Sequence, residues 1–451
     1  MPSSRDQLLA AGLSIVEAVS KQSLFQMAEE RLHQLPGAER AAQVAWFVPG
    51  RVEVCGKHTD YAGGRSLLAA VERGFCVVAR TRRDAEVNLC DAKSGEQASL
   101  HLSAEPGSQQ LRWPRYARTV IRRIARNFPS ARRGADIAFA SDLPPAAGLS
   151  SSSALIIAIF LALWESNSLE QFPCYAANIH SREDLAAYLA AIESGKSYGE
   201  LHGDEGVGTT GGSEDHTAIL CSTPRELAQY SFCPTRKENA IAFPPECIFA
   251  IAASGIAAEK TGAALDRYNR TAAAAHAILN LWRRAAGRMD ETLAAAHNSS
   301  PGASAQLRSL LRQNEFEGFS AKTLLDRYDQ FAQESEIFVP AASDAFACKD
   351  WRALGRLMDR SQAAAEKLLG NQVPESVALA RMARESGARA ASSFGAGFGG
   401  SVWALVSRDS ADEFLRMWHE RYRAQFPDAA ARGMFFLTDA GPAAFRLDLA
   451  K

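Results

Sequence analysis

The chain has 451 residues, of which 47% are hydrophobic and 22% are charged, an ordinary composition for a globular protein. Its formal net charge of -1, with Lys and Arg scattered along the chain, gives no sign of a nucleic-acid or anionic-membrane partner. The longest apolar stretch, residues 154–164, falls short of the roughly 18 to 20 residues that span a bilayer, so we expect no membrane partner.

The N-terminus and the cysteines indicate the compartment. Residues 1–6 lack the pattern of a signal peptide. The eight cysteines show no CxxC motif and no His/Cys ligand cluster, which favours reduced thiols over disulfides or a zinc site. We therefore expect a cytoplasmic protein.

The length favours two domains rather than one compact core. Composition shifts to Pro, Lys and Asn around residues 232–243, and we place the boundary there, giving domains 1–235 and 236–451. No internal repeat or low-complexity tract is present.

Hydrophobic periodicity predicts mixed helices and strands in both halves. In the first half the predicted helices lie within 6–34 and at 115–128, 151–164 and 183–193, and the predicted strands at 46–49, 66–81, 85–91 and 135–140. In the second half the predicted helices are 262–287, 289–298, 321–333, 350–368, 376–386 and 410–426, and the predicted strands are 247–253, 402–406 and 433–437. Ser410 and Glu413 have the spacing of a capping box.

A strand, a loop and a helix follow one another between residues 136 and 164, with a run of four serines at the start of the helix. A helix N-terminus offers unpaired N–H groups and partial positive charge, and serine hydroxyls add donors, so this loop predicts a nucleotide phosphate site. The predicted contacts are Pro145, Gly148, Leu149, Ser150, Ser151, Ser152 and Ser153. The alternative is that Ser151 or Ser152 caps a buried helix.

Residues 395–400 contain four glycines and precede a predicted strand. Glycine lets the backbone approach a ligand closely, so we expect this loop to face the site. It fits G-x-G-x-x-G but does not open a helix, which disfavours a nicotinamide-dependent dehydrogenase. Gly195-Lys196-Ser197 imitates the end of a P-loop, but Ala190 stands where its first glycine belongs.

Together with residues 49–64, the loops at 143–154 and 395–400 resemble the three signature motifs of the GHMP small-molecule kinases, and the first is closest to the galactokinase branch. The resemblance covers roughly residues 45–405. It implies a two-domain α+β fold, with an N-terminal domain like domain 2 of ribosomal protein S5 and a ferredoxin-like C-terminal domain. It also implies ATP-dependent phosphorylation of a monosaccharide at the anomeric hydroxyl, with Mg²⁺, by a monomer or weak homodimer.

The resemblance assigns the catalytic pair to Asp215 and Arg51. Asp215 would take the proton of the attacking hydroxyl, and Arg51 would keep that carboxylate ionised and offset phosphoryl charge. The alternatives are a turn or helix-capping aspartate and a surface arginine.

The metal ligands implied by the motif match are Ser152 and Glu193. Mg²⁺ keeps several waters, so one hydroxyl and one carboxylate suffice. Twenty-one residues separate Glu193 from Asp215, more than the family usually has. Glu200, Asp204 and Glu205 are therefore competing candidates.

The resemblance implies a sugar site at Asp60, His58, Tyr268, Gly212 and Gly397. A carboxylate such as Asp60 can accept two ring hydroxyls. His58 and Tyr268 have structural alternatives, a buried hydrogen bond and a core-facing aromatic.

Lys57, also expected at the sugar site, departs from the family pattern, which has a glutamate there for the C6 hydroxyl. Lysine only donates and carries the opposite charge. Either Lys57 pairs with Glu53, or it meets an anionic C6, which would make the substrate a uronic acid such as galacturonate. Arabinose and a heptose are further candidate substrates, and a catalytically silent sugar- and ATP-binding sensor is the alternative of another class.

Overall fold

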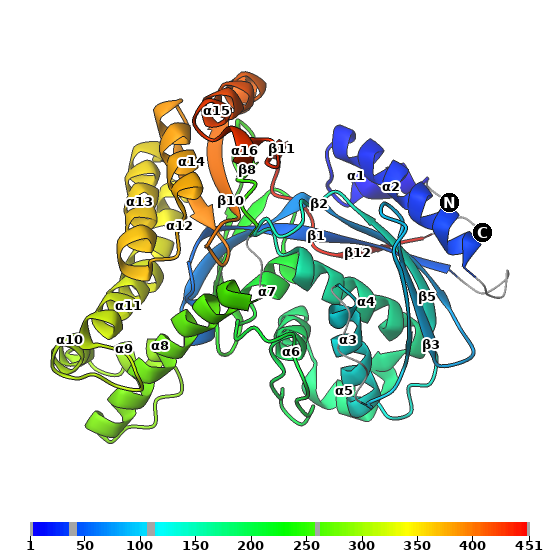
Figure 1. Cartoon of the computed structure of the whole chain (residues 1–451), viewed down its shortest axis with the longest axis horizontal. Coiled ribbons are helices and arrows are strands. Elements are labelled where there is room, and N and C mark those ends of the chain that lie inside the picture. Colours follow the sequence, from blue (N-terminus) through cyan, green and yellow to red (C-terminus); the bar gives the residue numbers. More distant parts are fainter. Residues whose placement is uncertain (1–2, 36–42, 106–112, 258–261, 449–451) are drawn as a thin grey trace.

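The computed structural model describes residues 3–35, 43–105, 113–257 and 262–448 (Figure 1). Two β-sheets with helices packed against them organise the described chain, which confirms the mixed α/β prediction. None of the helices in these ranges is long and apolar enough to cross a membrane.

The strands form an eight-stranded and a four-stranded sheet. The first contains β1 (Gln43–Cys55), β2 (Arg65–Thr81), β3 (Glu86–Asp91), β4 (Gln97–His101), β5 (Ala135–Ser141), β6 (Glu226–Ser231), β7 (Arg236–Ala242) and β12 (Phe445–Leu447). The second contains β8 (Cys247–Ala253), β9 (Ala390–Phe394), β10 (Ser401–Ser407) and β11 (Met434–Thr438).

The helices fall into groups along the chain. The first part carries α1 (Ser4–Ala10), α2 (Ile15–Gln34), α3 (Pro114–Asn127), α4 (Ser151–Asn167), α5 (Pro173–Asn178), α6 (Arg182–Ser194) and α7 (Glu214–Cys221). The middle carries α8 (Gly262–Ala286), α9 (Leu293–His297), α10 (Ala303–Gln313), α11 (Ala321–Gln333) and α12 (Val339–Ala347). The last part carries α13 (Trp351–Ala364), α14 (Pro374–Glu385), α15 (Ala411–Gln425) and α16 (Pro427–Ala430). Short 3₁₀ or π segments are η1 (Asp60–Ala62), η2 (Leu169–Gln171), η3 (Glu334–Phe338), η4 (Ala365–Leu369) and η5 (Arg408–Ser410).

Helices cover both faces of the large sheet, as Figure 1 shows. Neighbouring residues of a strand point to opposite faces, so Phe47 packs with α1 and α2 while Val48 packs with α4. Because helices cover both faces, β1 and β2 are buried along almost their whole length. The sheet thereby fixes α4, and with it the serine run, over β1.

The small sheet has the order β11-β8-β10-β9, and all its pairs are antiparallel. One face packs on α14 and α15, and the other joins the core shared with the large sheet. Helices α8 to α11 form a separate apolar cluster that includes Tyr61 and Ala62. Helices α8 to α11 thus pack against residues 61 and 62, which follow β1.

The domain boundary at 235/236 stays a prediction. The residues around it form the hairpin of β6 and β7, whose strand β6 pairs with β2. The last strand, β12, pairs with β1. The large sheet therefore contains strands from both sides of residue 235.

Two local predictions need correction. Strand β1 continues past Pro49 through Arg51 to Cys55, where the sequence suggested a loop, because pairing with β2 resumes after an irregularity at Pro49. Ser410 makes no side-chain cap, since the turn η5 runs directly into α15 and keeps Ser410 out of the extended conformation that a capping serine adopts.

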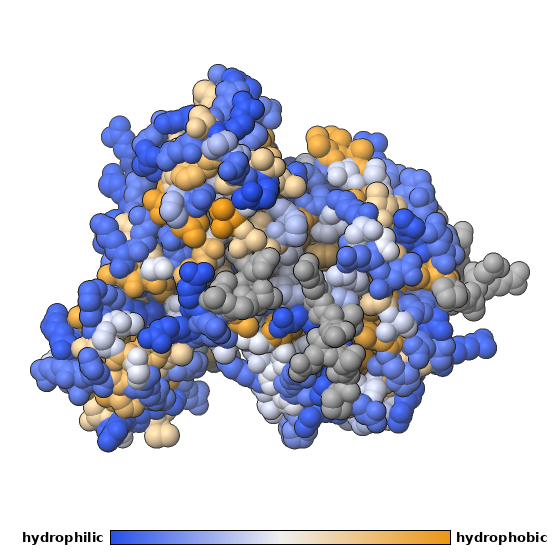
Figure 2. Space-filling view, in the orientation of Figure 1, coloured by the Kyte–Doolittle hydropathy of each residue, from blue (hydrophilic) through white to orange (hydrophobic). Residues whose placement is uncertain are grey.

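The face in Figure 2 is mostly hydrophilic, and a cluster of hydrophobic residues lies over the region of α1 and α2. Ile15 and Val16 of α2 are 65% and 77% exposed. Exposed apolar residues are common on the surfaces of folded proteins.

Candidate active site

One cavity of about 1200 Å³ lies where β1, α4, α7 and the β9–β10 loop meet. Most of the residues predicted from the sequence line it: Arg51, His58, Asp60, Pro145, Gly148, Ser150, Ser151, Ser152, Ser153, Glu193, Gly212, Asp215 and Tyr268. Three do not: Lys57, Leu149 and Gly397.

Arg51 and Asp215 meet on the wall of this cavity. Nε of Arg51 donates to Oδ1 of Asp215 at 2.8 Å, and Nη2 lies 2.6 Å from the same oxygen. Arg51 also donates to the carbonyl of Gly148, and its side chain is buried. The predicted contact is therefore confirmed, and it ties the carboxylate to the loop that precedes α4.

Helix α4 begins with its serines facing the cavity. Ser150, the residue before its first turn, has φ 61° and ψ 37°, and its hydroxyl has no hydrogen-bond partner among the described residues. None of the serines makes the side-chain cap that was the alternative interpretation. The N–H groups of this helix start remain available to an anion. The side chain of Leu149, in contrast, packs in the apolar core. Its backbone carbonyl accepts the backbone N–H of Arg51 at 3.3 Å.

Ser153 links the two acidic side chains of the site. Its hydroxyl lies 2.8 Å from Oε2 of Glu193 and 3.4 Å from Oδ2 of Asp215. A single hydroxyl donates only one hydrogen, so the shorter contact to Glu193 is the hydrogen bond. Ser152, one residue earlier, is the neighbouring hydroxyl on the cavity wall.

The competing carboxylates lie elsewhere. Asp204 and Glu205 pair with Arg122 of α3 at 3.0 and 3.3 Å, and Glu200 is exposed. None of the three lines the cavity, so Glu193 is the candidate that the geometry keeps. The described residues hold no cluster of three or more His, Cys, Asp or Glu side chains that could bind a metal ion.

Asp60 lies beside the start of α7. Its Oδ1 accepts the N–H of Tyr61 at 2.8 Å and its Oδ2 the N–H of Glu214 at 3.2 Å. Burial raises the pKa of Asp60, and these two N–H groups oppose the rise. A Cβ at Gly212 would lie 2.5 Å from Oδ2, so only glycine permits this close approach.

His58 and Tyr268 form an aromatic wall of the cavity, with ring centroids 5.4 Å apart. The ring nitrogens of His58 contact the hydroxyl of Tyr61 at 3.0 Å and the carbonyl of Ala396 at 3.1 Å. His58 thus joins the loop after β1 to the glycine loop.

The glycine loop reaches the cavity with Gly395 and Ala396 rather than with Gly397. Gly397 has φ 77°, and a Cβ there would lie 2.4 Å from the carbonyl oxygen of Asn371. This glycine serves close packing inside the C-terminal part, which corrects its assignment as a substrate contact.

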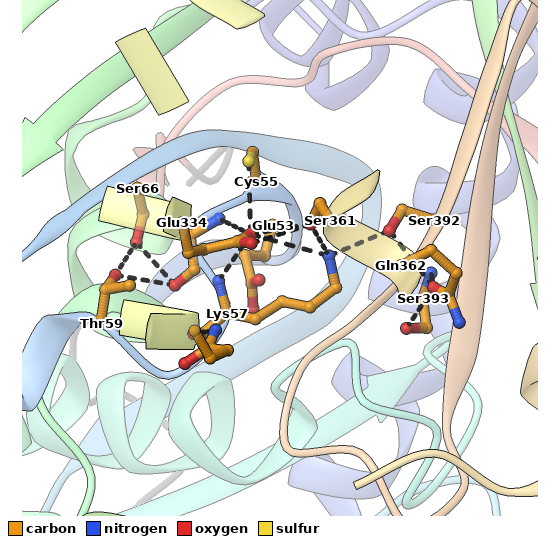
Figure 3. A network of polar contacts seen from close by, with 12 residues as sticks. Glu53, Cys55, Lys57, Thr59, Ser66, Glu334, Ser361, Gln362, Ser392 and Ser393 are labelled. Carbon is orange, nitrogen blue, oxygen red and sulfur yellow. Dashed lines mark hydrogen bonds and ion pairs between the residues drawn. The ribbon is translucent and has the colours of Figure 1, made fainter. Parts of the chain in front are cut away.

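Lys57 points away from the cavity. Its ammonium group lies 2.9 Å from the hydroxyls of both Ser361 and Ser392, and 3.8 Å from Oε1 of Glu334 (Figure 3). The side chain is 1% exposed. Neither predicted role holds in this geometry: the partner of Lys57 is Glu334 rather than Glu53, and its charge does not face the cavity.

Sequence reasoning did not place two acidic groups in the site: Glu53, which it named only as a possible partner of Lys57, and Glu214. Oε2 of Glu214 accepts the hydroxyl of Ser66 at 2.8 Å, and its Oε1 lies 3.9 Å from Nε of Arg51. Burial raises the pKa of Glu214 well above its usual range, and the nearby Glu53 adds to the rise. The available signal was position: Glu53 follows Arg51 by two residues on one strand, and Glu214 directly precedes Asp215.

An aromatic end of the cavity was also missed. Trp113 and Phe139 line it with ring centroids 5.6 Å apart, and Phe75 lies 5.6 Å from Phe139. The sheet brings Phe75 and Phe139 together on neighbouring strands β2 and β5, while Trp113 precedes α3. Flat apolar rings of this kind suit a planar heterocycle.

Comparisons with known proteins identify three segments. The N-terminal domain of the GHMP kinases matches residues 115–204, the C-terminal domain of the GHMP kinases matches 342–424, and the galactokinase galactose-binding signature matches 34–81.

Relatives called galactokinase match over different lengths. One from Actinobacillus pleuropneumoniae serotype 5b (strain L20) is 35% identical over 134 residues, 30% of this chain and 34% of its own. One from Roseiflexus sp. (strain RS-1) is 28% identical over 373 residues, 81% of this chain and 84% of its own. The more identical match thus spans only about a third of its relative.

The fold resembles that of Lactococcus lactis galactokinase complexed with galactose, with a TM-score of 0.75, 21% identity, and coverage of 94% of this chain and 99% of that one. A D-glycero-D-manno-heptose 1-phosphate kinase from Bacteriodes thetaiotaomicron has a TM-score of 0.54 at 12% identity, covering 90% and 100%. At such identities these likenesses establish the fold. The three matched segments place the chain in the GHMP kinase family, and within that family its residues 34–81 are similar to the galactose-binding signature of the galactokinases.

Proposed function

We propose that the protein is an ATP-dependent kinase that phosphorylates the anomeric hydroxyl of a monosaccharide, with galactose as the first candidate. The observation that carries this proposal is the contact of Arg51 with Asp215, on a cavity that also holds the start of α4 and Asp60. A carboxylate, a cation, an anion-binding helix start and a polyol-binding carboxylate are the parts that such a transfer needs.

The nucleotide would lie along one side of the cavity. Its base would lie against the aromatic end of the cavity formed by Trp113 and Phe139, and its phosphates would lie over the serines at the start of α4. The N–H groups and hydroxyls there stabilise phosphate charge. Arg51 supplies a cation that Asp215 and Gly148 hold in place.

Asp215 would act on the acceptor. The hydroxyl proton moves to its carboxylate while the hydroxyl oxygen forms a bond to the terminal phosphorus. The bond from that phosphorus to the bridging oxygen breaks, and ADP leaves with the electron pair. Ser152 and Glu193 would hold Mg²⁺, which supplies charge neutralisation at the phosphates.

The sugar would bind against Asp60, His58 and Tyr268. Because Lys57 is buried away from these residues, its charge would not be offered to the carboxylate of a uronic acid. A neutral sugar is therefore the better substrate. The galactose-binding signature at residues 34–81 supports galactose, and arabinose and a heptose remain as comparison substrates.

The test is ADP release by the purified protein with ATP, Mg²⁺ and each of galactose, galacturonate, arabinose and a heptose. We expect turnover of galactose above galacturonate, with the phosphate on the anomeric oxygen by NMR. Asp215→Asn should lower kcat by roughly 10²- to 10⁴-fold. ATP binding without turnover of any sugar would favour the silent sensor instead.

A further inference from the structure

Glu53 is a buried carboxylate on the cavity wall to which the proposed chemistry gives no task. It follows Arg51 by two residues on β1, so both side chains point to the same face of the strand. Arg51 reaches Asp215 from this face. Figure 3 shows Glu53 beside the network that surrounds Lys57.

The two oxygens of Glu53 differ. Oε2 accepts the N–H of Gly395, a cavity-lining residue of the glycine loop, at 3.2 Å. Oε1 has no hydrogen-bond partner among the described residues, and the side chain is 3% exposed. Asp60, another buried carboxylate of the cavity wall, accepts an N–H on each oxygen.

The neighbouring cations do not satisfy this oxygen. Lys57 directs its ammonium to Ser361 and Ser392, and Arg51 directs its guanidinium to Asp215 and Gly148. A buried acceptor without a donor is costly, and in native proteins such groups usually meet a ligand or water. The donor for Oε1 must therefore come from outside the described side chains.

We propose that Oε1 of Glu53 accepts a hydroxyl of the bound sugar, which makes Glu53 a specificity-determining residue of this site. This inference rests on the proposed function. Its Oε2 contact with Gly395 fixes the carboxylate, and a fixed acceptor discriminates strongly against a substrate that lacks the matching hydroxyl. Glu53 thereby supplies the acceptor that Lys57, turned away, does not.

The experiment combines substitutions at Glu53 with the removal of single hydroxyls from the sugar, in the manner of a double-mutant cycle. The kcat/KM of the wild type is measured for D-galactose and its 2-, 3-, 4- and 6-deoxy derivatives, or for deoxy derivatives of whichever sugar is turned over. The same set is measured for Glu53→Gln and Glu53→Met. At pH 8, above the pKa of about 7 that burial gives Glu53, the carboxylate is ionised. The wild type should then lose roughly 10- to 100-fold on one deoxy sugar beyond the others, the effect of a hydrogen bond to a charged group. Glu53→Met should lose this amount on the parent sugar and little on that deoxy sugar.

Glu334→Gln is the control, because it removes a buried carboxylate that holds a neighbouring loop, at Gly56 and Lys57, without lining the cavity. It should lower kcat/KM for all sugars by the same factor. An equal loss on every sugar in the Glu53 variants, or no loss, overturns the inference. If Glu53→Met does not fold, the same comparison is made with Glu53→Gln. The difference between its losses on the parent sugar and on the deoxy sugar should then be smaller.

A failure of the proposed function can be distinguished from a failure of the inference about Glu53. A wild type that binds sugars without turnover contradicts the kinase, and the cycle is then read as dissociation constants. A wild type that binds no sugar overturns both.

Discussion

The ammonium of Lys57 lies 3.8 Å from Oε1 of Glu334, which comes 277 positions later in the chain. The same oxygen accepts the N–H groups of Gly56 and Lys57 at 3.0 and 3.3 Å. Glu334 begins the π-helical segment η3, and such segments are frequent at functional sites. The pair therefore holds the loop after β1 against η3, the segment between α11 and α12.

Lys57→Glu should destabilise the protein rather than change its sugar preference. The substitution places a second carboxylate beside Glu334 where neither is solvated, and breaking a buried pair in this way costs about 3 to 5 kcal/mol of unfolding free energy. Urea unfolding measures the loss. Lys322→Met, at an exposed lysine of α11, should change stability by less than about 0.5 kcal/mol. A folded, stable Lys57→Glu protein with altered sugar preference would show that Lys57 reads the substrate.

Arg51→Lys should lower kcat by roughly 10²-fold or more, the range seen when one preorganised donor to developing charge is lost. Lysine keeps the charge, but it cannot bond Asp215 and the Gly148 carbonyl from one planar group. Steady-state kinetics with ATP and the preferred sugar measures it, and the KM of the sugar should change little. Unchanged kcat would remove Arg51 from the chemistry.

Glu193→Gln should raise the Mg²⁺ concentration needed for half-maximal ADP release. Asp204→Asn is its matched control, since Asp204 pairs with Arg122 and does not line the cavity. The amide at 193 keeps the size of the side chain but loses the charge that a hard cation prefers. Mg²⁺ titrations of ADP release compare the two variants. A larger shift in Asp204→Asn than in Glu193→Gln would reverse the assignment.

Stability should fall as pH rises toward neutrality, in part because of Glu53. Burial raises the pKa of Glu53 to about 7, although Lys57 and Arg51 oppose the rise. Below about pH 4.3, the pKa of a glutamate in the unfolded chain, the folded and the unfolded protein both hold the proton of Glu53. Its contribution to the unfolding free energy is then complete. Between that pH and about 7 only the folded state holds the proton, so the unfolding free energy falls as pH rises, by up to about 1.4 kcal/mol per pH unit for one group.

Glu53→Gln should therefore flatten this decline, measured by urea unfolding at pH 5, 6 and 7. Glu420→Gln, at a half-exposed carboxylate of α15, should leave the slope as in the wild type. Residual decline in Glu53→Gln is expected from Glu214, whose pKa burial also raises. An unchanged slope would mean that Glu53 is ionised throughout.

The sequence predicted features that depend on neighbouring residues. The apolar helix α4, the serine run at its start and the glycine loop are recognisable because periodicity and glycine conformation are local properties. The resemblance to the GHMP kinases paired Arg51, in the first loop, with Asp215, which lies outside the three loops and 164 positions later, and their contact is confirmed. Their catalytic roles stay predictions.

Only the tertiary structure decided where Lys57 points and which glycine reaches the cavity. The partners of Lys57 are Glu334, Ser361 and Ser392, which no local pattern links to it. Strand β12 is equally invisible to a local pattern, because it is three residues long and exists by pairing with β1. A buried charged side chain points toward the polar partners that surround it in the packed structure. For Lys57 these partners come from segments hundreds of residues away in the chain.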